Sequence, residues 1–262
     1  MNWKTELKKL WYPTHTKVKL TQWICHLAII PAIMYGSWPL WIACFVMCLL
    51  VHGLGSGIGA HRYFTHHSFK TNKFWEFVMA FFFTIACSGS LLGYILIHEK
   101  HHSRPDREGD PHNPNENGFV KTWLGFFNKQ NLNFSPRRYK QLFDKPIFKF
   151  FHKYYFLIIS IYALGLFAIN PLFPLFFLCL PSVYQFHANS ALIVLTHSGN
   201  LGSRNFETND DSRNIWWLKP LLLGEELHNN HHRYPANVTM RATNSWKEFD
   251  PLYYIINLIR ID

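Results

Sequence analysis

Acidic side chains are scarce in this chain, in which 16 Asp and Glu stand against 26 Lys and Arg and leave a formal net charge of +10. No nucleic-acid-binding motif accompanies this charge, so we expect no nucleic acid partner. Anionic lipid headgroups or an acidic partner protein are the expected partners of a basic surface. The five cysteines all lie in apolar runs without a C-x-x-C pair, which argues against a disulfide framework.

The first residues also lack the short apolar segment and small-residue cleavage site of a secretory signal. We therefore expect the mature chain to begin near Met1. Four later stretches lack charge almost entirely: residues 20–35, 39–54, 150–169 and 172–196. Each is close to the roughly 20 residues that span a hydrocarbon core. The sequence predicts four transmembrane helices, at about 20–37, 38–58, 150–169 and 172–196. A soluble protein with very apolar helices is the alternative.

The basic residues are confined to segments that the four predicted helices would leave on one side. Residues 1–19 hold 5 Lys and Arg, residues 62–153 hold 14 and residues 204–260 hold 7, while the short connections at 36–38 and 170–171 hold none. The positive-inside rule makes the charged side cytoplasmic. We expect an integral, multi-pass membrane protein with both termini in the cytoplasm and with residues 59–149 and 197–262 on that side.

Histidine is abundant, and half of the 16 histidines fall in three clusters. The clusters are His61 and His66; then His98, His101 and His102; then His228, His231 and His232. Positions i, i+3 and i+4 of a helix share a face, so each H-x-x-H-H is expected to deliver three ring nitrogens to one volume. Eight imidazoles exceed the coordination of one ion, which indicates two metals. His197, at the end of the last apolar run, is a ninth candidate. The remaining seven histidines are predicted not to be ligands: His15, His26, His52, His67, His112, His152 and His187.

A fifth apolar run, residues 74–97, separates the first cluster from the second. If this run crossed the membrane once, the two histidine clusters would lie on opposite faces. They could then not contribute ligands to the same metal centre. We therefore predict a helix or broken helical hairpin on the cytoplasmic side, with the break at Ser88-Gly-Ser90. The predicted fold is an all-α polytopic membrane protein, one domain over residues 1–262, whose cytoplasmic helical cap holds a histidine-rich di-metal site.

Imidazole suits iron, copper, zinc and nickel, and neutral ligands leave the metal charge to be balanced by nearby carboxylates. Glu99, Asp106, Asp110, Glu225 and Glu226 are close enough in sequence to supply them. A zinc hydrolase would need far fewer ligands. A redox-active di-metal centre beside an apolar membrane domain favours oxygen chemistry on a lipid.

Several motifs together resemble the membrane fatty acid desaturases of the Δ9, stearoyl type. They are Gly55-Ser-Gly-Ile-Gly-Ala-His61-Arg-Tyr-Phe-Thr-His66-His-Ser-Phe69, His98-Glu-Lys-His-His102, Asp110-Pro-His-Asn-Pro114, Ser212-Arg-Asn-Ile-Trp-Trp217 and Gly224-Glu-Glu-Leu-His-Asn-Asn-His-His232. The resemblance implies a non-haem di-iron enzyme that uses O2 and two electrons to place a cis double bond in a saturated acyl chain. It also implies that the iron ligands are the eight clustered histidines and His197.

Two positions depart from that family's pattern. Ile193 stands four residues before His197, where an asparagine commonly holds a metal-bound water. Tyr94-Ile-Leu-Ile97 stands where acyl-CoA members tend to carry Trp-x-Arg-Asp, so an acyl-lipid substrate is favoured while acyl-CoA and other acyl carriers stay open.

The electrons must come from another protein, because the chain has no His-Pro-Gly-Gly haem segment, C-x-x-C set or dinucleotide fingerprint. The glycines at 53, 55, 57 and 59 follow no strand and are interpreted as helix-packing positions. A separate ferredoxin or cytochrome b5-like donor is expected to dock on the basic face. Three alternatives are a di-iron lipid hydroxylase or ketolase, a membrane metal- or haem-transport protein, and a catalytically silent lipid-binding relative.

Overall fold

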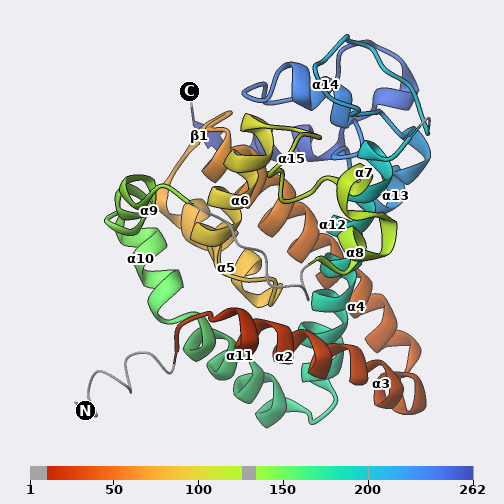
Figure 1. Ribbon diagram of the computed structural model, residues 1–262. Helices are drawn as coiled ribbons and strands as arrows, with labels where there is room; N and C mark the ends of the chain where they lie inside the picture. The colour runs from red at the N-terminus through yellow and green to blue at the C-terminus, as the bar shows by residue number, and fades with distance from the viewer. Residues whose placement is uncertain (1–10, 126–133, 200, 262) are drawn as a thin grey trace. The chain divides into compact units, whose positions relative to one another are not determined.

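The computed structural model describes residues 11–125, 134–199 and 201–261, and helices dominate them (Figure 1). The basic residues 1–10, predicted to begin the mature chain in the cytoplasm, lie outside the described residues. The α-helices are α2 (His15–Leu27), α3 (Ile29–Tyr35), α4 (Trp38–Leu49), α5 (Lys73–Ile85), α6 (Leu91–Ser103), α7 (Pro114–Asn117), α8 (Phe119–Trp123), α9 (Pro136–Phe143), α10 (Pro146–Lys153), α11 (Tyr155–Ile169), α12 (Leu180–His197), α13 (Lys219–Leu222), α14 (His228–Arg233) and α15 (Pro251–Ile259).

Two π-helical segments continue or precede these α-helices: η1 (Leu50–Thr65) follows α4, and η3 (Leu175–Cys179) leads into α12. Two short 3₁₀ segments are η4 (Trp216–Leu218) and η5 (Trp246–Glu248). The described strands, β1 (Lys70–Thr71) and β2 (Arg260–Ile261), pair antiparallel with Lys70 opposite Ile261.

Three helices are long and apolar enough to cross a membrane: His15–Tyr35, Trp38–Thr65 and Leu175–His197. The third predicted span, 150–169, is bent by 64° between Pro146–Lys153 and Tyr155–Ile169, so four crossings result only if this pair counts as one. The second predicted span, 38–58, has no helix end at residue 58, because the helix runs on to Thr65. The prediction of several membrane-spanning helices is confirmed, whereas the number four and the cytoplasmic side stay predictions.

The turn that joins the first and second predicted helices is short, as expected, and so is the turn that joins the third and fourth. Gly36 is extended and ends α3, and α4 follows at once with Pro39 in its first turn. At the other connection Asn170 is extended, and its side chain accepts a hydrogen bond from the backbone N–H of Leu172 at 2.8 Å. These turns need no charged residue, which explains why the basic residues lie elsewhere.

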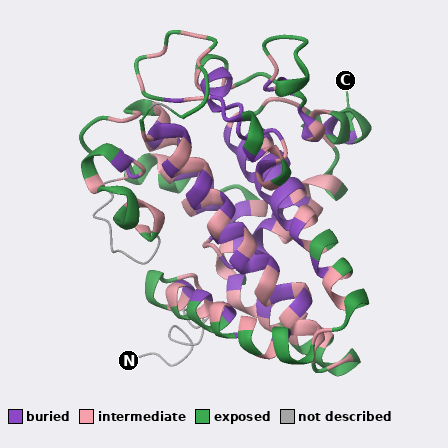
Figure 2. Cartoon of the chain, turned by 90° about the vertical axis from the view of Figure 1, so that its right-hand side faces the viewer, coloured by how far each residue is buried: buried purple, intermediate pink, exposed green. Residues whose placement is uncertain are grey.

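Contacts divide the chain into two compact units, each built from separate stretches. The first unit comprises Met1–Ser56, Phe77–Tyr94 and Asn133–Phe186. One of its buried clusters joins Ala32, Cys44, Cys48 and Phe176, with Trp41 edge-on to the Phe176 ring at 5.1 Å. Large apolar side chains also lie outward on these helices: Ile33, Ile42 and Leu164 are each more than 60% exposed, and green runs along the helix faces in Figure 2. Such faces are expected of helices solvated by lipid.

The fifth apolar run is broken, as predicted. α5 ends at Ile85 and α6 begins at Leu91, and the turn between them has left-handed backbone at Cys87 and Gly89. Gln22 of α2 fastens this turn, because its Nε2 donates to the carbonyl of Cys87 at 3.0 Å and to Ser182 Oγ at 2.9 Å. Each half has only 13 residues, which is too short for a single helix to span a bilayer.

The second unit comprises Gly57–Glu76, Ile95–Leu132 and His187–Asp262. It contains all nine predicted ligand histidines, although the segments that carry them are far apart in the sequence. Purple in Figure 2 marks the buried stretches of these helices. The candidate site can therefore be described entirely within this unit.

Candidate metal centre

The nine predicted ligands form two groups of histidines. Within each group, one ring nitrogen per residue lies within 4.8 Å of all the others. The first group is His61, His66, His98, His102 and His231, and the second is His101, His197, His228 and His232. The seven histidines predicted not to be ligands lie outside both groups.

The two H-x-x-H-H motifs are shared between the groups. On α6, His98 and His102, four residues apart, serve the first group while His101 serves the second. On α14 the assignment is reversed, because His228 and His232 serve the second group and His231 the first. The expectation that each motif delivers three nitrogens to one volume was therefore wrong. Positions i+3 and i+4 of a helix lie on opposite flanks of position i. The middle histidine of each motif, His101 or His231, therefore reaches the neighbouring group.

The five-residue spacing of His61 and His66 is explained by π-helical backbone. The N–H of His66 donates to the carbonyl of His61 at 3.1 Å, the i to i+5 pattern of a π-turn. The wider turn brings the two residues to the same side, and their ring centroids are 4.9 Å apart. His66 then meets His98 with 2.9 Å between their Nε2 atoms.

The nitrogen separations suit a shared metal ion. In the first group, Nε2 atoms are 3.0 Å apart for His61 and His231 and 2.9 Å apart for His102 and His231. An imidazole nitrogen binds a first-row ion such as zinc at roughly 2.0–2.1 Å, and two such ligands at a right angle are about 3.0 Å apart. In the second group, Nε2 of His232 lies 3.1 Å from that of His228 and 3.3 Å from that of His101.

Carboxylates orient four of the imidazoles through Nδ1. Asp110 accepts from His101 at 3.0 Å, Asp106 from His197 at 2.9 Å and Asp210 from His232 at 2.9 Å. Glu225 accepts from His61. A proton on Nδ1 leaves Nε2 with its lone pair, and these lone pairs face one another inside the groups. The Nε2 of His197 is buried without a hydrogen-bond partner among the described residues, as expected of an atom reserved for a metal.

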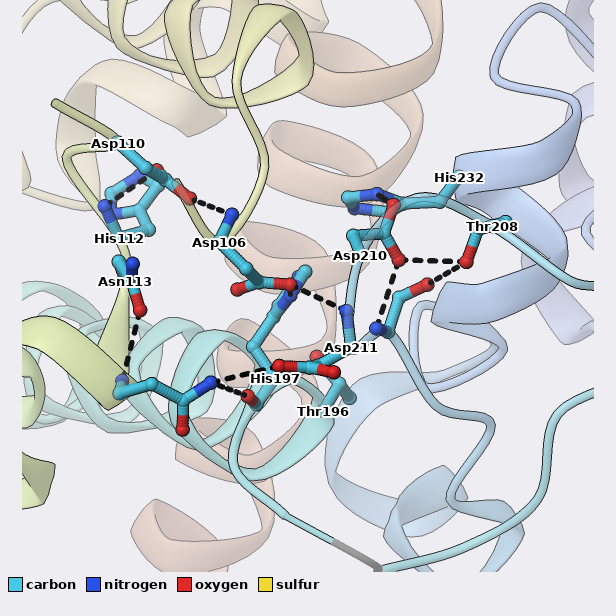
Figure 3. A network of polar contacts seen from close by, with 12 residues as sticks. Asp106, Asp110, His112, Asn113, Thr196, His197, Thr208, Asp210, Asp211 and His232 are labelled. Carbon is cyan, nitrogen blue, oxygen red and sulfur yellow. Dashed lines mark hydrogen bonds and ion pairs between the residues drawn. The ribbon is translucent and has the colours of Figure 1, made fainter. Parts of the chain in front are cut away.

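Figure 3 shows how two of these carboxylates are themselves held. The Asp106 carboxylate lies between His197 and the backbone N–H of Asp211, from which it accepts at 2.7 Å. The Asp210 carboxylate accepts from the Thr208 hydroxyl at 2.8 Å as well as from His232. Asp106, Asp110 and Glu225 were proposed from sequence as carboxylates near the metals, and each lies against an imidazole. Glu99 was also proposed, but it is not among the four carboxylates described above. Glu226, the fifth residue proposed, instead accepts from the backbone N–H of Gly224 at 2.7 Å.

A buried arginine supports Glu225. Arg62 Nε donates to Glu225 at 3.0 Å, and its two terminal nitrogens donate to Asp250 at 2.8 and 3.1 Å. Arg62 is 1% exposed and Asp250 is fully buried, so this ion pair lies away from solvent. Asp250, Arg62, Glu225 and His61 thus form one chain of contacts that ends at the first group.

Asparagines fix the third histidine cluster. The Asn214 side-chain oxygen accepts from the backbone N–H groups of Asn229 and Asn230 at 3.0 and 3.2 Å, which satisfies free donors in the first turn of α14. Its Nδ2 donates to Asn230 Oδ1 at 2.9 Å. Asn214 belongs to the Ser212–Trp217 motif, to which sequence reasoning gave no role. Sequence reasoning also missed Asp210, Arg62 and Asp250, whose partners are distant in the chain.

Burial favours the neutral form of six of these histidines. It lowers the pKa of His66 to about 2, with a further contribution from neighbouring His61. Burial and then neighbouring imidazoles also hold the pKa values well below the usual range for His98, His102, His228, His231 and His232. A neutral imidazole is the form that binds a metal, so these six histidines are in the metal-binding form at neutral pH.

The chain matches the model of a family described as fatty acid desaturase over residues 36–256. It is 29% identical to an sn-1 stearoyl-lipid 9-desaturase of Anabaena variabilis over 228 residues, which is 86% of this chain and 82% of that protein. It is 30% identical to Delta-9 acyl-lipid desaturase 1 of Arabidopsis thaliana, with 86% and 73% covered.

A third relative, an acyl-CoA C20 Delta5-desaturase of Anemone leveillei, is 27% identical, with 85% of this chain and 72% of that protein covered. These relatives differ in acyl carrier and in bond position, but all are desaturases. The match covers every segment that contributes a histidine to the two groups. The chain belongs to the fatty acid desaturase family.

Proposed function

We propose that this desaturase introduces a cis double bond at the Δ9 position of a saturated acyl chain, at a non-haem di-iron centre held by the nine histidines. The substrate is an acyl group esterified in a membrane lipid, and the centre lies on the cytoplasmic side. The observation that carries the proposal is the arrangement of nine imidazoles in two adjoining groups, with carboxylates fixing four of them. A hydrolytic zinc site would need only three or four such ligands.

The reaction removes one hydrogen from each of two adjacent methylenes and reduces O2 to two waters, with two electrons and two protons supplied from outside the substrate. When bound, the irons would supply the activation of O2 for this oxidation. The protein holds the metals, excludes competing ligands and positions the acyl chain. No side chain of the site is needed as a general acid or base on the substrate.

The two groups are unequal, which supports different roles for the two ions. The first offers five imidazoles and the second four. Ile193, one turn before His197 on α12, has no hydrogen-bonding side chain to hold a water beside the second group. The second group would therefore leave its ion with more open coordination than the first.

The carrier and the bond position are proposed from the relatives. Two of those described are named for position 9 and for lipid-bound acyl chains. The segment before the second motif, Tyr94-Ile-Leu-Ile97, also lacks the tryptophan and arginine expected of acyl-CoA enzymes. A ferredoxin or cytochrome b5-like protein supplies the electrons singly.

Fatty acids from cells that express the chain test this proposal. Gas chromatography with mass spectrometry of total lipids is expected to show a new monounsaturated acid, with its bond between carbons 9 and 10. The acid should be absent with His231→Ala and retained with His187→Ala, whose ring receives a hydrogen bond from Trp123 at 3.1 Å outside both groups.

Other products would redirect the assignment. A hydroxy or keto acid would favour a hydroxylase or ketolase, and a bond at another position would correct the regiochemistry alone. Lipids that stay unchanged while iron is bound and reducible would indicate a catalytically silent relative. Unchanged lipids with iron or haem carried across the membrane would favour the transport alternative.

A further inference from the structure

A polar pocket opens beside the two histidine groups within the second unit. Its volume is about 490 Å³, and the loop after α6 and the segment Glu207–Asp210 supply most of its lining. Two of its lining residues are ligand histidines, His102 from the first group and His232 from the second. Their rings are stacked, with centroids 4.7 Å apart.

The pocket reaches both groups where they are least buried. His102, His232 and His66 are half-buried, whereas the other six histidines are buried. Two of the three accessible ligands thus line one opening, one from each group. An electron that enters there would meet a ligand ring of each group directly.

The rim of the pocket is basic. Arg104, Arg107 and Arg233 all line it and all are exposed, and Arg233 lies over the Tyr234 ring at 5.4 Å. The lining also holds two carboxylates, Glu207 and Asp210. Asp210 is engaged by His232 and Thr208, and Glu207 is exposed, so three guanidinium groups and one carboxylate are presented outward and the rim keeps an excess of positive charge.

We propose that this pocket is the docking site of the electron donor, and that the donor is a small acidic redox protein. Carboxylates of the donor contact Arg104, Arg107 and Arg233, and each encounter would pass one electron from the donor to an ion held by the histidine groups, with His102 and His232 as the ligand rings that face the donor. Two encounters provide the two electrons of a turnover, and the protons come from solvent. This inference rests on the proposed function, which requires an external donor.

The lining favours a protein over a lipid. Apart from Pro105, every side chain that lines the pocket is polar or charged, so an acyl chain would find no apolar surface there. Arginine forks suit donor carboxylates, and opposite charges at the rim of an interface mainly raise the rate of encounter.

The test measures reduction of the bound iron by stopped flow in purified, iron-loaded protein. The probes are a reduced plant-type [2Fe–2S] ferredoxin, the reduced soluble haem domain of cytochrome b5, and dithionite. The variants are Arg104→Glu with Arg107→Glu, the same pair with Arg233→Glu, and Arg107→Glu alone. Arg107→Glu alone is the mildest of these variants, because it changes a single exposed side chain that is not one of the histidine ligands. The matched control is Arg260→Glu, an exposed arginine of β2 outside the pocket lining.

We expect the double and triple variants to slow reduction by the better of the two protein donors at least about tenfold at low salt, and to weaken its dependence on ionic strength. In Arg107→Glu, the rate of reduction by dithionite and the iron content should both match those of wild type. Arg260→Glu should behave as wild type in every measurement. Unchanged donor rates would overturn the proposal. So would equal losses with donor and dithionite, or a loss that phospholipid vesicles alone relieve.

Formation of the unsaturated product, which tests the proposed function, is measured separately in the same preparation. A wild-type protein whose iron a donor reduces, but which forms no unsaturated product, would contradict desaturation and leave the docking result standing. A wild type that forms product while the charge variants take electrons normally would contradict the docking site alone.

Discussion

Nδ1 of His232 donates a hydrogen bond to Asp210 at 2.9 Å, across 22 residues of chain. The contact fixes which nitrogen of His232 faces the second group. Asp210→Ala should therefore lower the affinity for iron, and with it the activity, about 10- to 100-fold. Iron titration by calorimetry or by absorbance measures this. Asp144→Ala, which removes an exposed carboxylate paired with Lys140, should have no effect.

The ion pair of Arg62 with Asp250 and Glu225 predicts a loss of stability. Arg62→Met leaves two carboxylates buried without their cation, which should lower the free energy of unfolding by about 3–5 kcal/mol. The melting temperature in detergent checks this, with the exposed Arg260→Met as control. A variant that melts like wild type would mean that the buried contacts of Arg62 contribute little.

The glycines before His61 predict a contrast between two substitutions. A Cβ at Gly55 would lie 2.7 Å from the backbone nitrogen of Phe83, whereas one at Gly57 would lie 2.5 Å from the flexible tip of Leu252. Gly55→Ala should cost about 1–3 kcal/mol because backbone cannot yield, and Gly57→Ala should cost less. Thermal unfolding measures both.

Gly165 provides the control for that comparison. It lies in the helix α11, and a Cβ there would meet nothing within 4 Å. Gly165→Ala should therefore leave the melting temperature unchanged or raise it, since alanine favours helix. Equal losses for Gly55→Ala and Gly165→Ala would contradict the close helix packing at Gly55.

Glu226 predicts a pH effect on stability. Burial raises the pKa of this carboxyl to about 7. The folded state then keeps its proton at pH values where the unfolded state, with an ordinary pKa near 4.5, has lost it. Its contribution to stability is complete below about pH 4.5 and is lost as the pH rises through about 7.

Glu226→Gln removes this titration and keeps an acceptor for the Gly224 N–H. The free energy of unfolding of the variant should be close to that of wild type at pH 5. At pH 8 it should exceed that of wild type by up to about 3 kcal/mol. Melting curves of both proteins across that range test the prediction. A wild type that gains stability relative to the variant as the pH rises would contradict it.

What could be predicted from the sequence depended on how local the cause is. The spacing of His98, His101 and His102 is a property of one helix turn, so all three could be assigned to a metal centre. Their division between two groups depends on α14, which packs from a remote segment, and the spacing alone could not give it.

The supporting residues show the same limit. Asp110 lies nine residues from His101 and could be proposed from nearness. Glu225 could be proposed beside His228, yet its partner is His61, 164 residues away. The contacts of Asp210 with His232 and of Asp250 with Arg62 could not be predicted from the sequence, because loops bring these carboxylates to the site. The bend after α10 was likewise hidden, because residues 150–169 carry one charge, Lys153, and no proline or glycine at the turn around Tyr154.

The central claim is that the nine histidines hold two irons, and metal analysis of the purified protein tests it most directly. Wild type should bind two iron ions per chain. His98→Ala, which removes a ligand of the first group, and His228→Ala, which removes one of the second, should each retain about one. One metal per wild-type chain, or identical complete loss of metal from a well-folded His228→Ala and from His98→Ala, would contradict two separate sites.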